Sequence, residues 1–576
     1  MTKKSNEMST LIFDIEADGL SADVSEVFCI SIAKAFTDDE PLLFVGDDVP
    51  EGLELLSHSE RIIGHNIINY DIPVLKKLYG FEYWGTTIDT LLLSRLIYPD
   101  IKEKDWNIYS SNNMPKNMVG SHSLKAWGVR LRLAKAEHED FSEYSSQMGE
   151  YCSRDVEVTK KLFFHLRSKS PSDVSVMLEH EFASIIQEQH ERGFCFDVAK
   201  AQQLYTTLAA RRQEIKDQMV GTFPPKIVEL KTKTKEIPFN PASRDQIANM
   251  LIQKYKWKPR LFTGTGKPQI NELVLSELEY PEAKVLQEYL TINKRISQMA
   301  EGKTAWLKLE RDGRLHGSVN TNGTVTGRCT HNRPNLAQVV STRSLYGKEC
   351  RELFVPSPGF VMCGVDASQL ELRCLAHYMA RFDGGKYRDL LLQEDIHTVN
   401  QEAAGLPTRD ASKLFIYALI YGAGSAKIGQ IIGGTAPMGQ ILKERFFRNI
   451  PALKQLIQAV RDKANRTGYL VGLDGRKLPV RSEHSALNLL LQSAGAVIMK
   501  QATVNMRILF DGELKRDEWH QVGHIHDEVQ FEARPGVAEE LGAYAVRGIR
   551  ETSEILSLRC PLDGEYKIGT SWADTH

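Results

Sequence analysis

Residues 365–373 read VDASQLELR, residues 409–422 read RDASKLFIYALIYG and residues 526–528 read HDE. They place a carboxylate, a cationic helix and a second carboxylate along the chain in that order. Asp366 and Asp527 are far apart in the sequence, yet they could converge to hold divalent metal, which prefers carboxylate oxygens. Two ions roughly 3.5–4 Å apart suit phosphoryl transfer, because they stabilise the attacking and leaving oxygens.

The middle stretch has a second regularity, in the spacing of its charged and aromatic residues. Arg409, Lys413, Tyr417 and Tyr421 are each four apart, so on a helix they share one face. Two cations followed by two rings suit a triphosphate with a base attached. An aromatic stripe in a core is the alternative, but the two cations continue the stripe and argue against it. The three stretches together predict a nucleic-acid polymerase.

The same stretches resemble motifs A, B and C of family A DNA polymerases, particularly the replicative enzymes of short-tailed phages. The likeness runs from the N-terminus to the last residue and is weaker at about 101–120 and 200–235. It implies a multidomain α/β fold, in which an RNase H-like exonuclease domain precedes a right hand of palm, fingers and thumb. The implied division is 1–170 for the exonuclease, 171–320 for connecting helices and thumb, 321–400 for the first part of the palm, 401–480 for the fingers and 481–576 for the second part of the palm and the C-terminus.

The resemblance assigns the polymerase metals to Asp366 and Asp527, with a further ligand from the Ala367 carbonyl. It gives Glu528 an accessory catalytic role. The alternative for Asp527 and Glu528 is a simple hairpin turn after an apolar strand. The matching Asp366 and the basic helix favour the catalytic interpretation.

The resemblance also assigns the nucleotide site. Arg409 and Lys413 should cradle the triphosphate, and His397 in the stretch DIHT matches a phosphate-contacting histidine. Tyr417 should pack near the incoming sugar and base. Tyr421 should stack near the templating position at the end of the helix.

Two of these positions bear on which nucleotide is accepted. In the family, the position of Glu371 blocks a 2′-hydroxyl and bonds the tyrosine that matches Tyr421. A glutamate beside C2′ excludes ribonucleotides by clash and desolvation. The position of Tyr417 is Phe or Tyr, and a tyrosine hydroxyl there can compensate for a missing 3′-hydroxyl. We therefore expect ready use of dideoxynucleotides.

Another group of residues is expected to contact primer–template DNA. Arg328 lies in a TGR stretch that precedes RPNL at 333–336, as in the family. Asn488 and Gln492 are four apart on a helical run and match residues that probe the minor groove. Amide and guanidinium groups suit the acceptors common to all base pairs there. His526 is expected at the primer end, although each of these residues could be an ordinary surface or capping group.

A separate set of acidic residues lies in the N-terminal region. Asp14 and Glu16 are two apart on a strand-like run, so both face one side. Asp71 and Asp155 follow in order, with Tyr151 four before the last. An isolated Asp is more often a turn or cap residue, but the ordered set resembles the DEDDy 3′–5′ exonucleases. It implies a second two-metal site, with Mg²⁺ as the cofactor of both sites and Mn²⁺ as a substitute.

Composition is that of an ordinary globular protein. The chain has 576 residues, 42% hydrophobic and 25% charged, which suggests three to four domains. A net charge of −2 argues neither for nor against nucleic acid, because binding needs a local basic track. The eight scattered cysteines predict reduced thiols without a zinc site. No secretory leader or long apolar run is apparent, so we expect a cytoplasmic protein without membrane contact, in the host cell if phage-encoded.

Residues 223–246 interrupt the helical pattern of the expected thumb. Their basic residues form either a backbone-tracking surface or a solvated loop: Lys226, Lys231, Lys233, Lys235 and Arg244. The stretch is too short for the long thumb insertion of thioredoxin-dependent phage enzymes, so we do not expect thioredoxin as a clamp. Expected partners are primer–template DNA and dNTPs, and a replicative helicase–primase is a candidate.

Three other functions remain to be weighed. A 3′ exonuclease whose C-terminal half only binds duplex would need a degraded polymerase carboxylate, and both aspartates are intact. A nonenzymatic replication scaffold would not need metal ligands in both halves. A single-subunit RNA polymerase would share the palm and the basic helix, but Glu371 and the proofreading domain speak against it. The exonuclease pattern begins at Leu11 without a preceding 5′-nuclease, which favours phage genome replication over primer removal.

Overall fold

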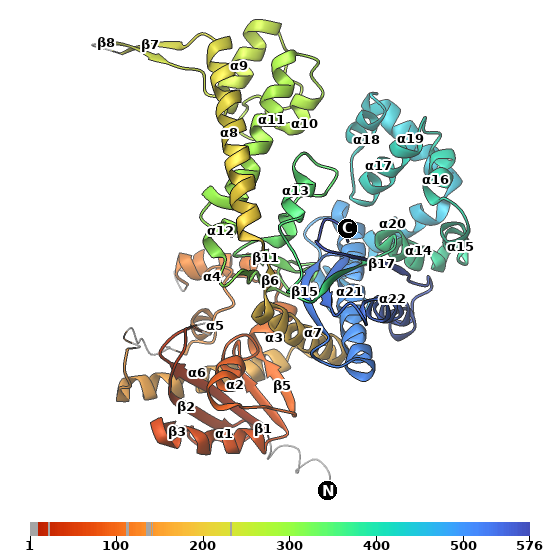
Figure 1. The fold of residues 1–576 in the computed structure, drawn as a ribbon. Helices are drawn as coiled ribbons and strands as arrows, with labels where there is room; N and C mark the ends of the chain where they lie inside the picture. The colour runs from red at the N-terminus through yellow and green to blue at the C-terminus, as the bar shows by residue number, and fades with distance from the viewer. Residues whose placement is uncertain are drawn as a thin grey trace.

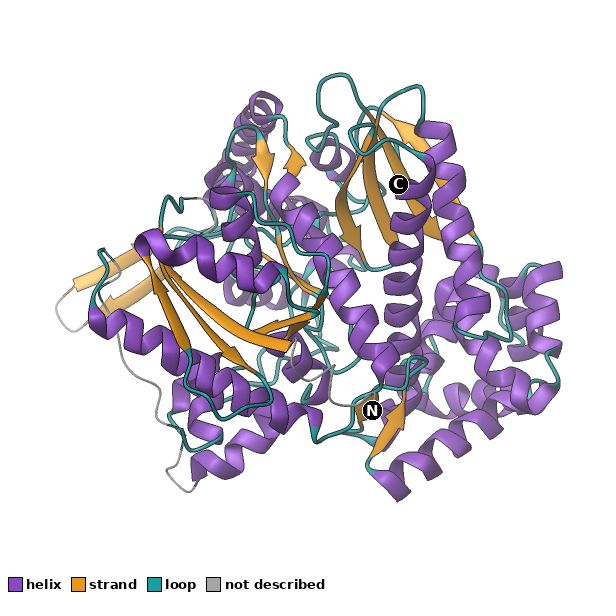
Figure 2. Cartoon of the chain, turned by 90° about the horizontal axis from the view of Figure 1, so that it is seen from below, coloured by secondary structure: helices purple, strands orange, loops and turns teal. Residues whose placement is uncertain are grey.

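The computed structural model describes residues 10–20, 23–110, 114–133, 140, 142–230 and 233–575 (Figure 1). An α/β domain at the N-terminus is followed by a larger part, in which a central sheet lies below two helical projections. Viewed from below, the five-stranded and the four-stranded sheets are separate, with helices between them (Figure 2). Within the described ranges, no helix combines the length and the apolar composition needed to span a lipid bilayer.

The N-terminal sheet has five strands in the order β3-β2-β1-β4-β5, with β1 antiparallel to β2 and parallel to β4. Its three central strands, β2, β1 and β4, are apolar and largely buried, and β3 and β5 form its edges. The strands are β1 (Thr10–Ala17), β2 (Val27–Lys34), β3 (Leu42–Val45), β4 (Arg61–Gly64) and β5 (Thr86–Asp89). The surrounding helices are α1 (Val49–Ser57), α2 (Asp71–Tyr79), α3 (Thr90–Ile97), α5 (Leu124–Arg130) and α6 (Ser146–Arg167).

The polar, Asn- and Ser-rich composition of residues 101–120 predicts a loop, and this prediction is wrong for its first half, where α4 (Ile101–Ser110) forms. This helix is attached to the domain by a buried polar residue, Asp105, and not by an apolar stripe. Its carboxylate accepts hydrogen bonds from Arg130 Nε at 2.9 Å, from Arg130 Nη2 at 2.7 Å and from the Gly120 N–H at 2.7 Å. Hydrophobic periodicity gives no sign of a helix that is anchored in this way.

The first projection, the expected thumb, is built around α8 and α11, which pack against each other (Figure 1). The interruption expected in the thumb is a two-stranded hairpin, β7 with β8. Lys231 lies outside the described residues. The elements from the connecting helix to the thumb are α7 (Asp173–Arg192), β6 (Phe194–Cys195), α8 (Val198–Thr222), β7 (Lys226–Leu230), β8 (Lys233–Ile237), α9 (Arg244–Tyr255), α10 (Glu272–Ser276), α11 (Pro281–Ile296) and α12 (Trp306–Leu309).

The central sheet has the order β15-β16-β12-β17, with antiparallel neighbours. Two long helices, α21 and α22, pack against each other, and α22 also covers β12 and β17. These elements form the expected palm: β12 (Val361–Ala367), α21 (Ala486–Glu513), β15 (Trp519–Ile525), β16 (Glu528–Ala533), α22 (Ala538–Ile555) and β17 (Gly564–Gly569). Smaller elements precede it, namely β9 (Arg314–Leu315), β10 (Ser318–Asn320), β11 (Thr330–Asn332) and α13 (Gly347–Arg351).

The second projection holds the expected fingers, residues 401–480, together with helices that begin within 370–400, a range predicted for the first part of the palm. The cationic helix forms over 409–420, and its apolar side packs into the largest core cluster through Phe415, Ile416 and Leu419. Its other side is thereby directed away from that core. The elements here are α14 (Leu370–Asp383), α15 (Lys386–Gln393), α16 (Ile396–Ala404), α17 (Arg409–Ile420), α18 (Ser425–Ile431), α19 (Ala436–Asn449), α20 (Pro451–Thr467), β13 (Tyr469–Val471) and β14 (Lys477–Pro479).

Candidate active sites

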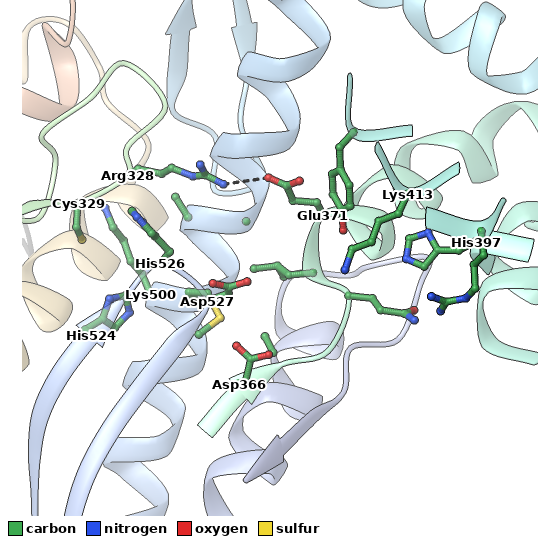
Figure 3. A pocket seen from close by; sticks show the side chains of 18 residues that line it. Arg328, Cys329, Asp366, Glu371, His397, Lys413, Lys500, His524, His526 and Asp527 are labelled. Carbon is green, nitrogen blue, oxygen red and sulfur yellow. Dashed lines mark hydrogen bonds and ion pairs between the residues drawn. The ribbon is translucent and has the colours of Figure 1, made fainter. Parts of the chain in front are cut away.

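A cavity of about 570 Å³ lies between the central sheet and α17. It gathers residues from three regions that are distant in the sequence. Figure 3 shows Asp366 and Asp527 on the palm side of this cavity, with Lys413 and His397 on the fingers side. Ten of the predicted site residues line it: Arg328, Asp366, Ala367, Glu371, His397, Arg409, Lys413, Tyr417, His526 and Asp527.

Backbone pairing brings the two aspartates of the cavity together. Asp366 is near the end of β12, and Asp527 lies in the tight turn between β15 and β16. The Ala367 N–H donates a hydrogen bond to the Asp527 carbonyl at 3.0 Å, which fixes the turn against the strand. Burial raises the pKa of Asp527. Two carboxylates that line the same cavity, one of them with a raised pKa, form a donor set that suits divalent cations.

Glu528, the third predicted carboxylate, does not line this cavity. It is buried, and Trp572 Nε1 and Gln530 Nε2 donate hydrogen bonds to its Oε1 at 2.5 and 2.6 Å. It borders a separate cavity of about 360 Å³, which Asp366 and Glu565 also line. The fully buried Trp572 brings the C-terminal segment against the palm sheet. Nothing in the sequence indicated that this segment contacts Glu528.

The cationic end of α17 has a partner that the sequence did not reveal. Arg409 Nε donates to Asp395 Oδ2 at 2.5 Å, and this ion pair lowers the pKa of Asp395 to about 2. Asp395 also caps α16, because its side chain accepts from the His397 N–H at 3.0 Å. Burial, followed by the charge of Arg409, lowers the pKa of His397. The contact therefore ties the start of α17 to the start of α16.

The far end of α17 meets Glu371. Tyr421 Oη donates to the two carboxylate oxygens of Glu371 at 2.7 and 3.0 Å, and Arg328 Nη2 approaches the same group at 3.3 Å. The rings of Tyr417 and Tyr421 lie 6.4 Å apart at an interplanar angle of 28°. Burial, followed by the hydrogen bond to Glu371, raises the pKa of Tyr421. Tyr421 is 45% exposed at the cavity's edge, and the helix ends with Gly422 at a φ of 76°.

The remaining predicted DNA-contacting residues are divided between two places. His526 lines the cavity, where burial and then the charge of Arg328 lower its pKa. Asn488 and Gln492 lie one turn apart on α21, outside the cavity lining. The Asn488 Oδ1 atom is buried and has no hydrogen-bond partner within the described residues. A buried polar atom without a partner is costly, so it is suited to receiving a donor from a bound molecule.

A buried ionic cluster behind the cavity escaped sequence reasoning. Lys500 Nζ and Arg476 Nη2 each donate to Glu179 Oε1 at 2.6 Å, and Arg476 also binds Asp474. Lys500 lines the cavity, while the Arg476 guanidinium lies so close to Gly327 that a Cβ there would come within 2.3 Å of it. The cluster therefore supports the loop that carries Arg328. Its members are far apart in the sequence, and each alone has the appearance of a solvated charge.

The residues predicted for the exonuclease site gather around β1. Asp14 and Glu16 lie on this strand, Asp71 begins α2, and Tyr151 and Asp155 lie on α6, which packs against β1. Burial, followed by the charge of Asp89, raises the pKa of Asp71 to about 7.

The pKa of the nearby Tyr70 shows that three of these carboxylates lie close to its ring. Burial, together with the charges of Asp71, Glu16 and Asp14, raises the pKa of Tyr70 to about 12. Carboxylates that crowd a buried site repel one another when ionised, which a divalent cation would relieve.

A thiol also belongs to this site. Possible ligand atoms of Asp14, Glu16 and Cys152 all lie within 4.8 Å of one another. Cys152 is buried, and its Sγ donates to the Asp14 carbonyl at 3.3 Å. The only sign in the sequence that Cys152 belongs to this site was its position directly after Tyr151.

Comparison with known proteins agrees with this architecture. Residues 202–574 match the model of DNA polymerase family A. The chain is 34% identical to the DNA-directed DNA polymerases of Enterobacteria phage T3 and Escherichia phage T7, over 98% of this chain and 100% of each relative.

Among solved structures, the POL domain of Pol1 from M. smegmatis, in complex with DNA primer-template and dNTP, matches 98% of this chain and 96% of its own. The TM-score is 0.78 at 19% identity. These matches confirm the predicted fold class, an RNase H-like domain joined to a right-hand polymerase. The chain belongs to DNA polymerase family A.

Proposed function

We propose that this protein is a template-directed DNA polymerase that adds dNTPs to a primer 3′ end and proofreads with a 3′–5′ exonuclease. The observation that carries the proposal is the cavity between palm and fingers. It sets the carboxylates of Asp366 and Asp527 opposite the cations of Arg409 and Lys413. The replication of a phage genome is the role that the T3 and T7 relatives favour. The domain division given above is part of the proposal.

In the polymerase site, the residues of the chain bind and orient the substrates. Arg409, Lys413 and His397 hold the triphosphate, and Tyr417 packs against the sugar and base. Asp366, Asp527 and the Ala367 carbonyl would hold Mg²⁺, or Mn²⁺ in its place. Such ions stabilise the attacking and leaving oxygens. Glu528 supports the site from behind, because Trp572 and the sheet hold it.

Around this centre, the proposal places the DNA. Tyr421 stacks at the templating position. Arg328 and His526 contact the primer end, and Asn488 and Gln492 contact the minor groove of the product duplex. The partners are therefore primer–template DNA and dNTPs, with a replicative helicase–primase as a candidate. The short β7–β8 hairpin supports a thumb that works without thioredoxin.

In the exonuclease site, Asp14, Glu16, Asp71 and Asp155 would hold divalent metal. Tyr151 orients the attacking water. The crowded carboxylates around β1 support this assignment.

Primer extension tests both activities. A labelled primer on a DNA template is incubated with Mg²⁺, with dNTPs present or withheld. Full-length growth with dNTPs and 3′ shortening without them are expected. Shortening under both conditions, together with no extension by an Asp14→Ala/Glu16→Ala variant, would identify an exonuclease whose C-terminal half only binds duplex.

Replacing Glu371 with alanine should relax discrimination against ribonucleotides by about a hundredfold, a typical value for a steric filter. The reason is that the Glu371 side chain lines the cavity and is held there by Tyr421 and Arg328. The ratio of kcat/KM for dNTP and rNTP gives the measurement. Glu371→Gln keeps the volume and should keep most of the selectivity, and Glu394→Ala, an exposed fingers carboxylate, should change nothing. Unchanged sugar selectivity in Glu371→Ala would refute this role.

Replacing Tyr417 with phenylalanine should make the enzyme reject dideoxynucleotides. In the wild type, the phenol hydroxyl compensates for the missing 3′-hydroxyl of the dideoxynucleotide. Because the substitution removes one hydrogen bond near a charged group, incorporation of ddNTP relative to dNTP should fall about tenfold or more. Relative incorporation of ddNTP and dNTP is the readout. Tyr544→Phe, on α22, serves as the control. Equal ratios for wild type and Tyr417→Phe would count against the prediction.

A further inference from the structure

The exposed side of α4 carries aromatic rings and cations outside both active sites. Trp106 is 42% exposed, and its ring meets Tyr109 edge to face at 5.4 Å. Lys102 is exposed one turn before Trp106, and the exposed Lys104 lies two residues before it, with its Nζ 4.8 Å from the centre of the Tyr98 ring. In Figure 1, α4 lies at the top of the exonuclease domain, above α5 and α6. The buried Asp105 fixes the helix, so these side chains stand on a rigid base.

This surface lies next to the template end of the fingers. Glu103, one turn from Trp106 and on the same side of α4, binds Arg481 Nη2 at 2.6 Å. Arg481 begins the loop that leads to His484. The His484 carbonyl lies against Gly422, where a Cβ would come within 2.5 Å of it. A short series of contacts therefore joins α4 to Gly422, the residue after Tyr421.

A cleft extends the surface between the exonuclease domain and the β13–β14 hairpin. It has a volume of about 210 Å³, too small for a duplex. Lys169 and Tyr98 line it from the exonuclease side and Lys477 from the hairpin. Lys477 Nζ also lies 5.5 Å from the centre of the Tyr469 ring. Cations thus occur on both walls, with the Tyr98 ring on one of them and the Tyr469 ring beside Lys477.

The charge of this region favours a polyanion. The exposed acids of α4 and its start are already neutralised, because Asp100 binds Lys104 at 2.9 Å and Glu103 binds Arg481. Among the residues that the structure describes, Lys102, Lys169 and Lys477 form no ion pair. Basic grooves with interleaved aromatic rings are typical of surfaces for single-stranded nucleic acid, where phosphates meet cations and bases stack on rings.

We infer that α4 and the adjoining cleft bind the single-stranded template on its way to Tyr421, with a base stacked on Trp106 and phosphates at Lys102, Lys169 and Lys477. The inference rests on the proposed placement of the templating base at Tyr421. It gives the exonuclease domain a second task, which is to guide the strand that the polymerase copies.

Binding of primer–templates with equal duplexes and different 5′ template overhangs tests this inference. In EDTA, which prevents digestion, wild type should bind an overhang of about 12 nucleotides more tightly than one of about 2. Trp106→Ala should weaken binding of the long overhang about tenfold and leave the short one unchanged. Trp84→Ala, which removes an 89% exposed tryptophan elsewhere in the domain, is the matched control.

A second measurement separates the lysines from the ring. Lys102→Glu and Lys169→Glu should each lower the salt dependence of long-overhang binding, by a slope of about 0.7 per lysine. Equal effects of Trp106→Ala on both overhangs, or none, would overturn the inference. So would weaker binding that appears only with a frayed primer 3′ end, which would assign the surface to the strand entering the exonuclease. Extension on the short overhang by Trp106→Ala reports separately on the proposed polymerase function.

Discussion

Replacing Asp527 with asparagine is expected to abolish primer extension, with a loss of kcat of about a thousandfold or more. The substitution removes a carboxylate from the cavity that Asp366 also lines and so weakens the hold on divalent metal. Metal ions contribute several kcal/mol of transition-state stabilisation, and about 4 kcal/mol corresponds to about a thousandfold. Single-turnover extension of a labelled primer is the measurement.

Three controls distinguish loss of catalysis from loss of structure. Desolvation in the cavity raises the pKa of Asp527, so a neutral amide of similar size should leave the thermal midpoint unchanged or slightly higher. Digestion of a mismatched 3′ end should persist, because that site lies in another domain. Asp517→Asn, an exposed aspartate before β15, should extend normally. Extension by Asp527→Asn at near wild-type rate would remove Asp527 from the catalytic set.

The sequence predicted the candidate sites best where the functional residues recur at the period of a single helix or strand. Arg409 to Tyr421 lie on one side of a single helix, and Asp14 and Glu16 on one side of a single strand, so spacing alone predicted how they are arranged. The convergence of Asp366 and Asp527 followed from their chemistry and from the resemblance. Strand pairing explains it, since the Ala367 N–H binds the Asp527 carbonyl.

The features that could not be predicted depend on partners distant in the chain. Asp395 shows no sign in the sequence that it binds Arg409, and Glu179 has the pattern of an ordinary helix surface although it is fully buried. Glu528 follows Asp527 directly, yet successive side chains of a strand point to opposite faces, so Trp572 meets it behind the cavity. Buried polar contacts of this kind leave no hydrophobic periodicity in the sequence, so pattern analysis does not detect them.

Replacing Asp14 and Glu16 together with alanine should abolish removal of a mismatched primer end, by about a thousandfold or more, and leave the rate of extension intact. The two carboxylates share one face of β1 with Cys152 close by, and losing both leaves divalent metal without its central ligands there. Stabilisation of several kcal/mol is lost at the exonuclease site alone. The measurement is 3′ digestion of matched and mismatched primers without dNTPs.

The control is a second double substitution that removes two acids with the same spacing and the same change in charge. Asp38→Ala with Glu40→Ala removes two exposed acids that are also two apart, just after β2, and should digest primers as wild type does. Errors retained in the extension products should rise only in the Asp14→Ala/Glu16→Ala protein, because extension past a mismatch then proceeds unchecked. Persistent digestion by that protein would move the exonuclease centre away from β1. Slower extension would instead mean that the exonuclease domain supports synthesis through its contacts with the polymerase half, as the Glu103–Arg481 ion pair permits.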